Sequence, residues 1–254
     1  MPAFTTIEPG CGARDVAPCP LTDRDIHVWA YSLAARAGDL ARWMLLLSDD
    51  ERRRAGRFRR AADADAYIVA HGGMRQLLSS YCVGTPRALR FTRAAGDKPV
   101  LDAAGGGPAI HFSLAHCSHG ALLAVSRSTE VGVDLEAARS DIDPTALAAQ
   151  FFCATERDAI AAAPPAFRTD AFFRHWVAKE AVLKARGTGL ACPLDAFALR
   201  FSATGDVAGV AASAAFGRSD WLVLRLPLPK GWYGALCAPE NYHVRLLAPM
   251  MPRA

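Results

Sequence analysis

The sequence predicts an α+β fold, in which helices and antiparallel strands occupy separate stretches of one chain. Residues 63–81 and 167–186 have the composition of long helices, whereas residues 108–136 and 194–247 alternate apolar and polar side chains as half-buried strands do. These stretches do not follow the regular strand–helix alternation that parallel α/β sheets require. A fold that combines helices with meanders of short strands is therefore expected.

The composition is that of a globular protein. Hydrophobic residues make up 52% of the 254 residues and charged residues 21%, a balance that excludes intrinsic disorder. No apolar run approaches the roughly 18 residues that span a bilayer, and no basic segment followed by an apolar one opens the chain. The seven cysteines are scattered without a Cys-x-x-Cys pair, which indicates reduced thiols. We therefore expect a cytoplasmic protein with no membrane contact.

Local signals place the first elements. Residues 25–33 are rich in β-forming side chains and predict the first strand. Ser48 and Glu51 have the spacing of a capping box, so a helix is expected to begin there. Gly72 and Gly73 lie within the next helical stretch, and they weaken it unless another element packs closely against them.

The second half of the chain continues with short strands, then helices, then strands again. After residue 108, two turns divide an alternating stretch into three strands, which predicts a β-meander. The expected strands are residues 110–114, 121–125 and 131–136; the expected helices are residues 143–152, 155–163 and 167–186, the last capped by Gly187. Four or five further strands are expected over residues 194–247, with a hairpin turn at 204–206.

The third strand of this meander carries paired acids. Asp134 and Glu136 point to one face of the strand, and Gly132 shares that face and is expected to leave it open. Two adjacent carboxylates repel each other unless water or a cation lies between them, and oxygen ligands suit Mg²⁺. The alternative is an ordinary edge strand whose acids lie in water.

The helix over residues 167–186 carries a second chemical signal. Glu180 and Lys184 are four residues apart on one helix face, and the neighbouring positions of that face, Phe173 and Val177, are apolar. This pattern places the two charges at the edge of a cleft, where Glu180 adds a third carboxylate and Lys184 meets the phosphates of a substrate. A solvated ion pair is the alternative.

Lysine is rare in this chain, which has 25 Arg and four Lys: Lys98, Lys179, Lys184 and Lys230. A lysine ammonium is a compact charge suited to a single phosphate oxygen. Lys98 lies in a turn and His116 at a strand end next to the acidic strand, and both also have ordinary structural explanations. Six Arg between residues 52 and 60 indicate a solvated helix face or a surface that binds phosphate or an acidic protein.

The order and spacing of these motifs resemble those of the surfactin-type 4′-phosphopantetheinyl transferases. The resemblance extends from about Ser48 to Leu190, and its specific parts are the acidic strand and the Trp-x-x-Lys-Glu-Ala-x-x-Lys helix. The matching segments are Gly96–Pro99, Phe112–His116, Gly132–Glu136, Phe151–Glu156 and Trp176–Lys184. Ala115 departs from the family pattern, in which serine is common at that position.

The resemblance implies transfer of the phosphopantetheine arm of coenzyme A to a serine of an apo carrier protein, acyl, peptidyl or aryl, with release of adenosine 3′,5′-bisphosphate. By resemblance, the Mg²⁺ ligands are Asp134, Glu136 and Glu180, and Glu180 is also a candidate base. The residues expected to contact coenzyme A are Arg54, Arg93, Lys98, Pro99, Ser113, His116 and Lys184. The residues expected to be catalytic are Glu180, Asp134 and Lys184.

The resemblance also implies two similar α+β halves related by pseudo-twofold symmetry, each with an antiparallel sheet and a long helix. The expected halves are residues 1–127, which contact the coenzyme A phosphates, and 128–254, which carry the metal-binding strand and the Lys-Glu helix. A chain containing both halves is expected to act as a monomer.

Two other functions fit part of the pattern. A Mg²⁺-dependent phosphohydrolase would use the same carboxylates without a carrier protein. A nucleic-acid-binding module would use the Arg-rich helix. The small net charge of +4, the confinement of the basic charge to one segment and the lack of an aromatic platform among the Arg residues argue against nucleic acid as the partner.

Overall fold

A computed structural model describes residues 5–6, 20–34, 39–82, 84–93, 98–102, 109–201, 207–211 and 221–247. Contacts divide the chain into two compact units. The N-terminal unit contains residues 2–92, 99–128 and 243–254, and the C-terminal unit contains residues 93–98 and 129–242. Among the described residues, no helix has both the length and the apolar character needed to cross a bilayer.

The sheet of the N-terminal unit is built around β2 (Asp25–Ser32), as the sequence predicts. One edge of β2 pairs antiparallel with β6 (Gly120–Ser126), which in turn pairs with β5 (His111–Cys117). The other edge pairs in parallel with β1 (Thr5–Thr6) and with β12 (His243–Leu247). All seven residues of β6 are buried, which suits a strand with neighbours on both edges.

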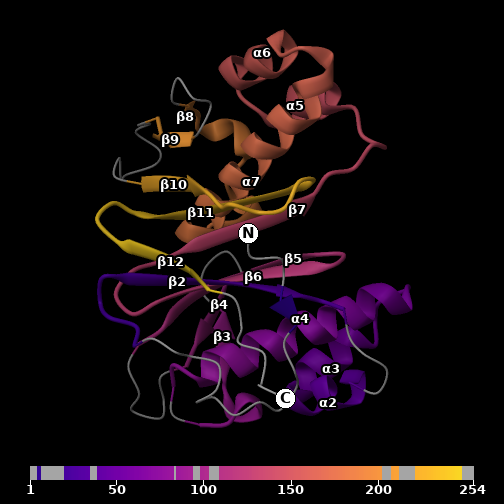
Figure 1. Cartoon of the computed structure of the whole chain (residues 1–254), viewed down its shortest axis with the longest axis vertical. Helices are drawn as coiled ribbons and strands as arrows, with labels where there is room; N and C mark the ends of the chain where they lie inside the picture. The colour runs from indigo at the N-terminus through magenta and orange to yellow at the C-terminus, as the bar shows by residue number, and fades with distance from the viewer. Residues whose placement is uncertain are drawn as a thin grey trace. The chain divides into compact units, whose positions relative to one another are not determined.

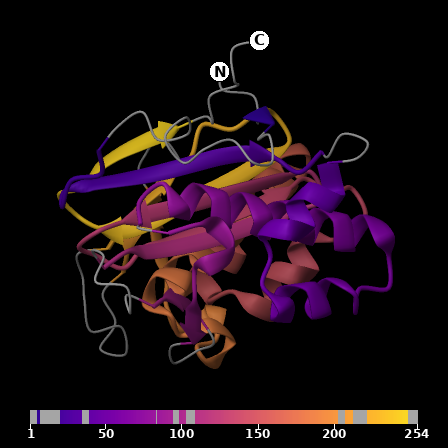
Figure 2. The same cartoon turned by 90° about the horizontal axis from the view of Figure 1, so that it is seen from below.

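Helices α2 (Asp39–Leu46), α3 (Asp49–Ala55) and α4 (Ala61–Ser79) follow β2 along the chain, and α4 lies against β5 and β6 (Figure 2). The predicted capping box is present, because Ser48 and Glu51 exchange hydrogen bonds at the start of α3. The one-turn helix η1 (Pro86–Ala88) and the paired short strands β3 (Phe91–Arg93) and β4 (Pro99–Leu101) come before β5.

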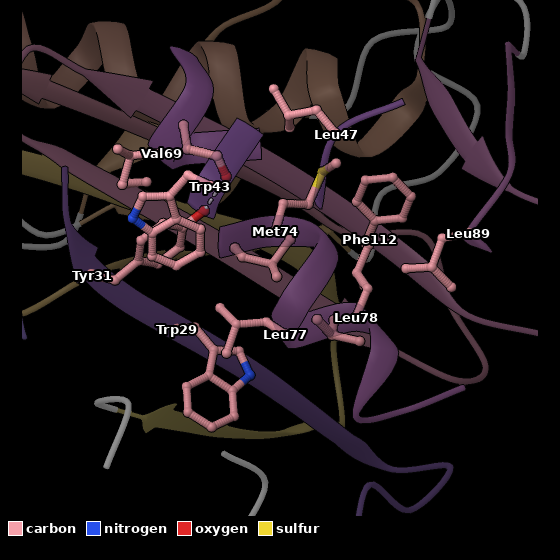
Figure 3. Close-up of a cluster of buried hydrophobic side chains, with 14 of the residues drawn as sticks. Trp29, Tyr31, Trp43, Leu47, Val69, Met74, Leu77, Leu78, Leu89 and Phe112 are labelled. Atoms are coloured by element: carbon pink, nitrogen blue, oxygen red, sulfur yellow. Dashed lines mark hydrogen bonds between the residues drawn. The ribbon is translucent and has the colours of Figure 1, made fainter. Parts of the chain in front are cut away.

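The glycine pair of α4 allows close packing in the core of this unit, where Figure 3 shows the rings of Tyr31 and Trp43. A Cβ at Gly72 would lie 2.7 Å from the Trp43 ring, and one at Gly73 would lie 2.7 Å from the Tyr31 ring. The Tyr31 hydroxyl donates a hydrogen bond of 2.8 Å to the Ala70 carbonyl. The expectation that another element packs against these glycines is confirmed.

The C-terminal unit contains the antiparallel sheet β10 (Trp221–Arg225)–β11 (Trp232–Pro239)–β7 (Gly132–Ala137). Helix α7 (Arg168–Arg186) lies along β7 and β11, and α5 (Pro144–Phe151) and α6 (Ala154–Ala162) pack against it (Figure 1). Gly187 ends α7 in the left-handed conformation, with φ 68°. Strands β8 (Leu199–Phe201) and β9 (Val207–Val210) pair antiparallel, and the predicted turn at 204–206 lies outside the described residues.

The predicted meander is wrong in its third strand. Strands β5 and β6 form the expected hairpin, but β7 pairs with β11 rather than with β6. The reason is that β2 already pairs with the second edge of β6, so no edge remains for β7. His116 of β5 is consequently not next to the acidic strand within one sheet, contrary to the expectation from sequence.

The α+β class is confirmed. Each unit has its own sheet and a long helix, α4 and α7, of 19 residues each. Contacts separate the units between Ser128 and Thr129 and group the last strand, β12, with the N-terminal unit. The pseudo-twofold relation and the functional division at residue 127 stay predictions.

Candidate active site

A single glycine brings α7 onto the acidic strand. A Cβ on Gly132 would lie 2.0 Å from the Ala181 carbonyl oxygen and 2.3 Å from the Ala185 nitrogen, so no other residue fits between β7 and α7. The sequence suggested that Gly132 leaves its face of the strand open, and this is wrong, because the helix covers it. Since alternate residues share a face of a strand, the same contact brings α7 near Asp134 and Glu136.

Lys184 of α7 pairs with Asp134 of β7. Its ammonium nitrogen lies 2.6 Å from Asp134 Oδ1. The Asp134 side chain is 8% exposed, which excludes for this residue the alternative of an acid in open water, whereas the Lys184 side chain is 31% exposed. The second oxygen, Oδ2, is buried and has no hydrogen-bond partner within the described residues. An unpartnered buried carboxylate oxygen is costly, so this atom is suited to a cation.

Two more carboxylates belong to the same electrostatic cluster. Burial raises the pKa of Glu136 to about 7, and the charges of Asp134 and Glu180 add to this effect, while Arg139 and Lys184 oppose it. Burial, and then the charge of Asp134, raise the pKa of Glu180, with Lys184 opposing. Three acids from two elements therefore share one site with a single lysine.

The carboxylate oxygens of these three acids are the kind of ligand that suits Mg²⁺. In the present arrangement, however, the described residues contain no group of three His, Cys, Asp or Glu close enough together to hold a metal ion. Lys184 supplies positive charge at Asp134 in this arrangement. The buried, unpartnered Asp134 Oδ2 and the clustered carboxylates are the features that a divalent cation would satisfy.

The N-terminal unit brings together two of the predicted coenzyme A residues. The Arg54 guanidinium lies 5.8 Å from the centre of the Tyr67 ring. Tyr67 stacks on His71, with ring centres 4.0 Å apart, and the His71 ring meets His116 edge-on at 6.3 Å. Tyr67 and His71 were not predicted from sequence; their four-residue spacing on a helix was the available signal.

The Glu51 carboxylate contacts His71 of this cluster and the neighbouring Arg75. It lies 3.4 Å from His71 Nδ1, and its other oxygen accepts a hydrogen bond of 2.6 Å from the buried Arg75 Nε. Burial alone would raise the pKa of Glu51, but His71, Arg75 and the Ser48 backbone outweigh it and lower the pKa to about 2. Arg75 also donates to two backbone carbonyls, so it is a structural cation.

The arginines between residues 52 and 60 have different roles in the structure. Arg52 donates to the Met44 carbonyl at 2.9 Å, and Arg53 pairs with Asp50 on its own helix. Both therefore stabilise the local structure. Arg54, which is exposed beside Tyr67, is the member of the stretch that lies in the aromatic cluster.

The other predicted residues are more dispersed. Lys98, 11% exposed, lies 2.5 Å from Glu130 Oε2 and donates to the Val131 carbonyl at 3.0 Å. Arg93 and Pro99 are exposed, at the end of β3 and the start of β4. Ser113 is buried, and because it is three residues from His116 on β5, the two side chains point to opposite faces.

Comparison with known proteins agrees with the motif pattern. The model of the 4'-phosphopantetheinyl transferase superfamily matches residues 130–235, which include β7 and α7. The chain is 32% identical over 171 residues to the 4'-phosphopantetheinyl transferase HetI of a Nostoc species, covering 67% of this chain and 72% of that protein. It is 29% identical over 168 residues to the 4'-phosphopantetheinyl transferase Sfp of Bacillus subtilis, covering 65% of this chain and 71% of that protein. The chain belongs to the 4'-phosphopantetheinyl transferase superfamily.

Proposed function

We propose that this chain transfers the 4′-phosphopantetheine arm of coenzyme A to a serine of an apo carrier protein, releasing adenosine 3′,5′-bisphosphate. Family membership supports the reaction. The observation that supports its location is the cluster of Asp134, Glu136, Glu180 and Lys184 between β7 and α7, which lies inside the matched segment.

The proposal includes Mg²⁺. Asp134, Glu136 and Glu180 would hold it, and the unpartnered Asp134 Oδ2 supports their fit to a hard cation. When bound, the metal would supply positive charge that stabilises the negative charge developing on the leaving group, adenosine 3′,5′-bisphosphate, as the pyrophosphate linkage of coenzyme A breaks.

Lys184 and Glu180 have different roles in this proposal. The Lys184 ammonium is partly exposed, so it can bind a phosphate oxygen of coenzyme A as well as Asp134. Glu180 lies on α7 rather than on the acidic strand β7, and we assign it the second role of the base that takes the proton of the carrier serine.

The nucleotide end of coenzyme A is assigned to the other predicted residues: Arg54, Arg93, Lys98, Pro99, Ser113 and His116. The cluster of Arg54, Tyr67, His71 and His116 offers cationic and aromatic groups together, and it supports binding of the adenosine phosphate. In this proposal residues 1–127 contribute the phosphate contacts and residues 128–254 the transfer chemistry, so one chain acts as a monomer.

Intact-mass analysis of apo acyl, peptidyl and aryl carrier proteins, each incubated with the enzyme, coenzyme A and Mg²⁺, tests the proposal. The expected result is the addition of one phosphopantetheine to a carrier, lost when the acceptor serine is replaced by alanine. Release of adenosine 3′,5′-bisphosphate at the same rate without any carrier would contradict it and favour the phosphohydrolase.

A further inference from the structure

The buried ion pair between Lys179 of α7 and Glu156 of α6 is the strongest polar feature of the C-terminal unit that the proposed function does not use. The Lys179 side chain is 0% exposed and that of Glu156 3%, and Lys179 Nζ lies 2.8 Å from Glu156 Oε2. The two groups form an ion pair. Glu156 Oε1 accepts a hydrogen bond of 2.9 Å from the Leu199 nitrogen.

The remaining contacts of the ammonium connect α7 to the segment before β8. Lys179 Nζ donates to the carbonyls of Leu194, at 2.7 Å, and Phe197, at 2.5 Å. It also lies 4.1 Å from the centre of the Phe197 ring. One side chain thus ties the middle of α7 to α6 and to residues 194–199.

A buried ion pair is weak grounds for stability, because the desolvation of two charges offsets most of their attraction. Directional contacts do, however, fix orientation in a way that apolar packing does not. On its other side, α7 meets β7 through Gly132, Ala181 and Ala185, a close contact of small residues whose side chains can form no hydrogen bonds.

Rotation of α7 would displace the residues that carry the chemistry. Lys179 directly precedes Glu180 and lies five residues before Lys184, so its anchoring sets the direction of both side chains. A helix with side chains has a radius of about 5–6 Å, so a rotation of about 20° moves a side-chain tip by about 2 Å. A displacement of even about 1 Å can reduce the rate about 100-fold.

We propose that Lys179 is a positioning residue, which through Glu156 and the carbonyls of Leu194 and Phe197 fixes the rotation of α7 and so holds Glu180 and Lys184 against Asp134. This inference rests on the proposed function for its kinetic consequence. Its structural consequence, the local order of α7, does not depend on which reaction the enzyme catalyses.

The test removes both charges while keeping side-chain size, with the double variant Lys179→Met/Glu156→Gln. The introduced glutamine retains an acceptor for the Leu199 nitrogen, and neither partner remains as an unpaired buried charge. The matched control is Arg174→Met/Asp170→Asn, which removes another ion pair of α7, one that is 32% and 36% exposed.

Two readouts separate positioning from general stability. We expect the double variant to unfold at a temperature within a few degrees of that of the wild type. Its kcat for carrier modification should nevertheless fall about 100-fold, whereas kcat of the control should stay unchanged. We also expect faster amide hydrogen exchange over residues 179–186, measured without substrate or metal, in the double variant only.

The outcomes are distinguishable from failure of the proposed function. If the wild type does not modify any carrier, the exchange measurement still tests the inference. Unchanged kcat, or unchanged exchange over residues 179–186, would overturn it. If the double variant does not fold, Glu156→Gln alone is measured in its place, and wild-type kcat together with wild-type exchange in that variant would overturn the inference.

Discussion

Replacement of Gly132 by alanine should separate α7 from β7 and abolish most of the transfer activity. The added Cβ would lie 2.0 Å from the Ala181 carbonyl oxygen, whereas ordinary contact begins at 3.4 Å, so the helix must move by about 1.4 Å. The contact involves the backbone of α7, so no side-chain rotation relieves it. Overpacking of this kind typically costs about 1–3 kcal/mol, which a protein of this size can tolerate while remaining folded.

The effect on chemistry should exceed the effect on stability. A shift of about 1.4 Å moves Glu180 and Lys184 away from Asp134, and misplacement by about 1 Å is associated with a rate loss of about 100-fold. Denaturant unfolding and the rate of carrier modification, measured on the same preparation, provide the comparison.

Gly56→Ala is the control, because Gly56 has φ −68° and its added Cβ would lie 3.7 Å from the nearest atoms, so stability and rate should be unchanged. A folded Gly132→Ala variant with a wild-type rate would refute the reasoning that the close approach of strand and helix forms the site.

Three further predictions concern single charges. Lys184→Ala should weaken coenzyme A binding in calorimetry by about 1.5–3 kcal/mol, and Lys184→Arg should restore it only in part, because the planar guanidinium has a different shape; full affinity in Lys184→Ala would contradict the phosphate contact. Glu180→Gln should lose about 10²–10⁴-fold in kcat even at saturating Mg²⁺, since the amide cannot accept the serine proton, whereas recovery at high Mg²⁺ would make Glu180 a ligand only. The pKa of Glu51 is lowered from 4.5 to about 2 in the folded protein, so ionised Glu51 contributes at most about 3 kcal/mol to the free energy of unfolding. This stabilisation should be complete above pH about 4.5 and disappear as pH falls through about 2. In urea unfolding, the difference between wild type and Glu51→Gln should shrink over that range, and a difference independent of pH would contradict the assignment.

Features specified by neighbouring residues were predictable from sequence. The capping box at Ser48, the cap at Gly187 and the hairpin of β5 and β6 depend on interactions within a few residues, and each is present in the structure. The sequence predicted that another element packs closely against Gly72 and Gly73, but it did not predict which one. The rings that pack there, those of Trp43 and Tyr31, come from elsewhere in the chain.

Features specified by distant partners were not predictable in the same way. The edge of β6 that β7 was expected to use is taken by β2, about a hundred residues earlier in the chain. The role of Gly132 was misread because its requirement comes from α7, some fifty residues later. Lys179 stood out as a rare lysine within the Trp-x-x-Lys-Glu-Ala-x-x-Lys motif. Its partner Glu156 belongs to a separate motif, so their contact became visible only in the folded chain.

Whether the cluster around Asp134 is the site of phosphopantetheine transfer is decided most simply by the modification of a carrier protein by Asp134→Asn. The substitution keeps the shape of the side chain and removes the negative charge that faces Lys184. Because asparagine keeps the size of the buried aspartate and the Lys184 ammonium that it faces is partly exposed, the variant should fold, which circular dichroism would verify. We predict that intact-mass analysis finds the carrier modified by the wild type and left in its apo form by Asp134→Asn; a folded variant that modifies the carrier at the wild-type rate would contradict the assignment of the site.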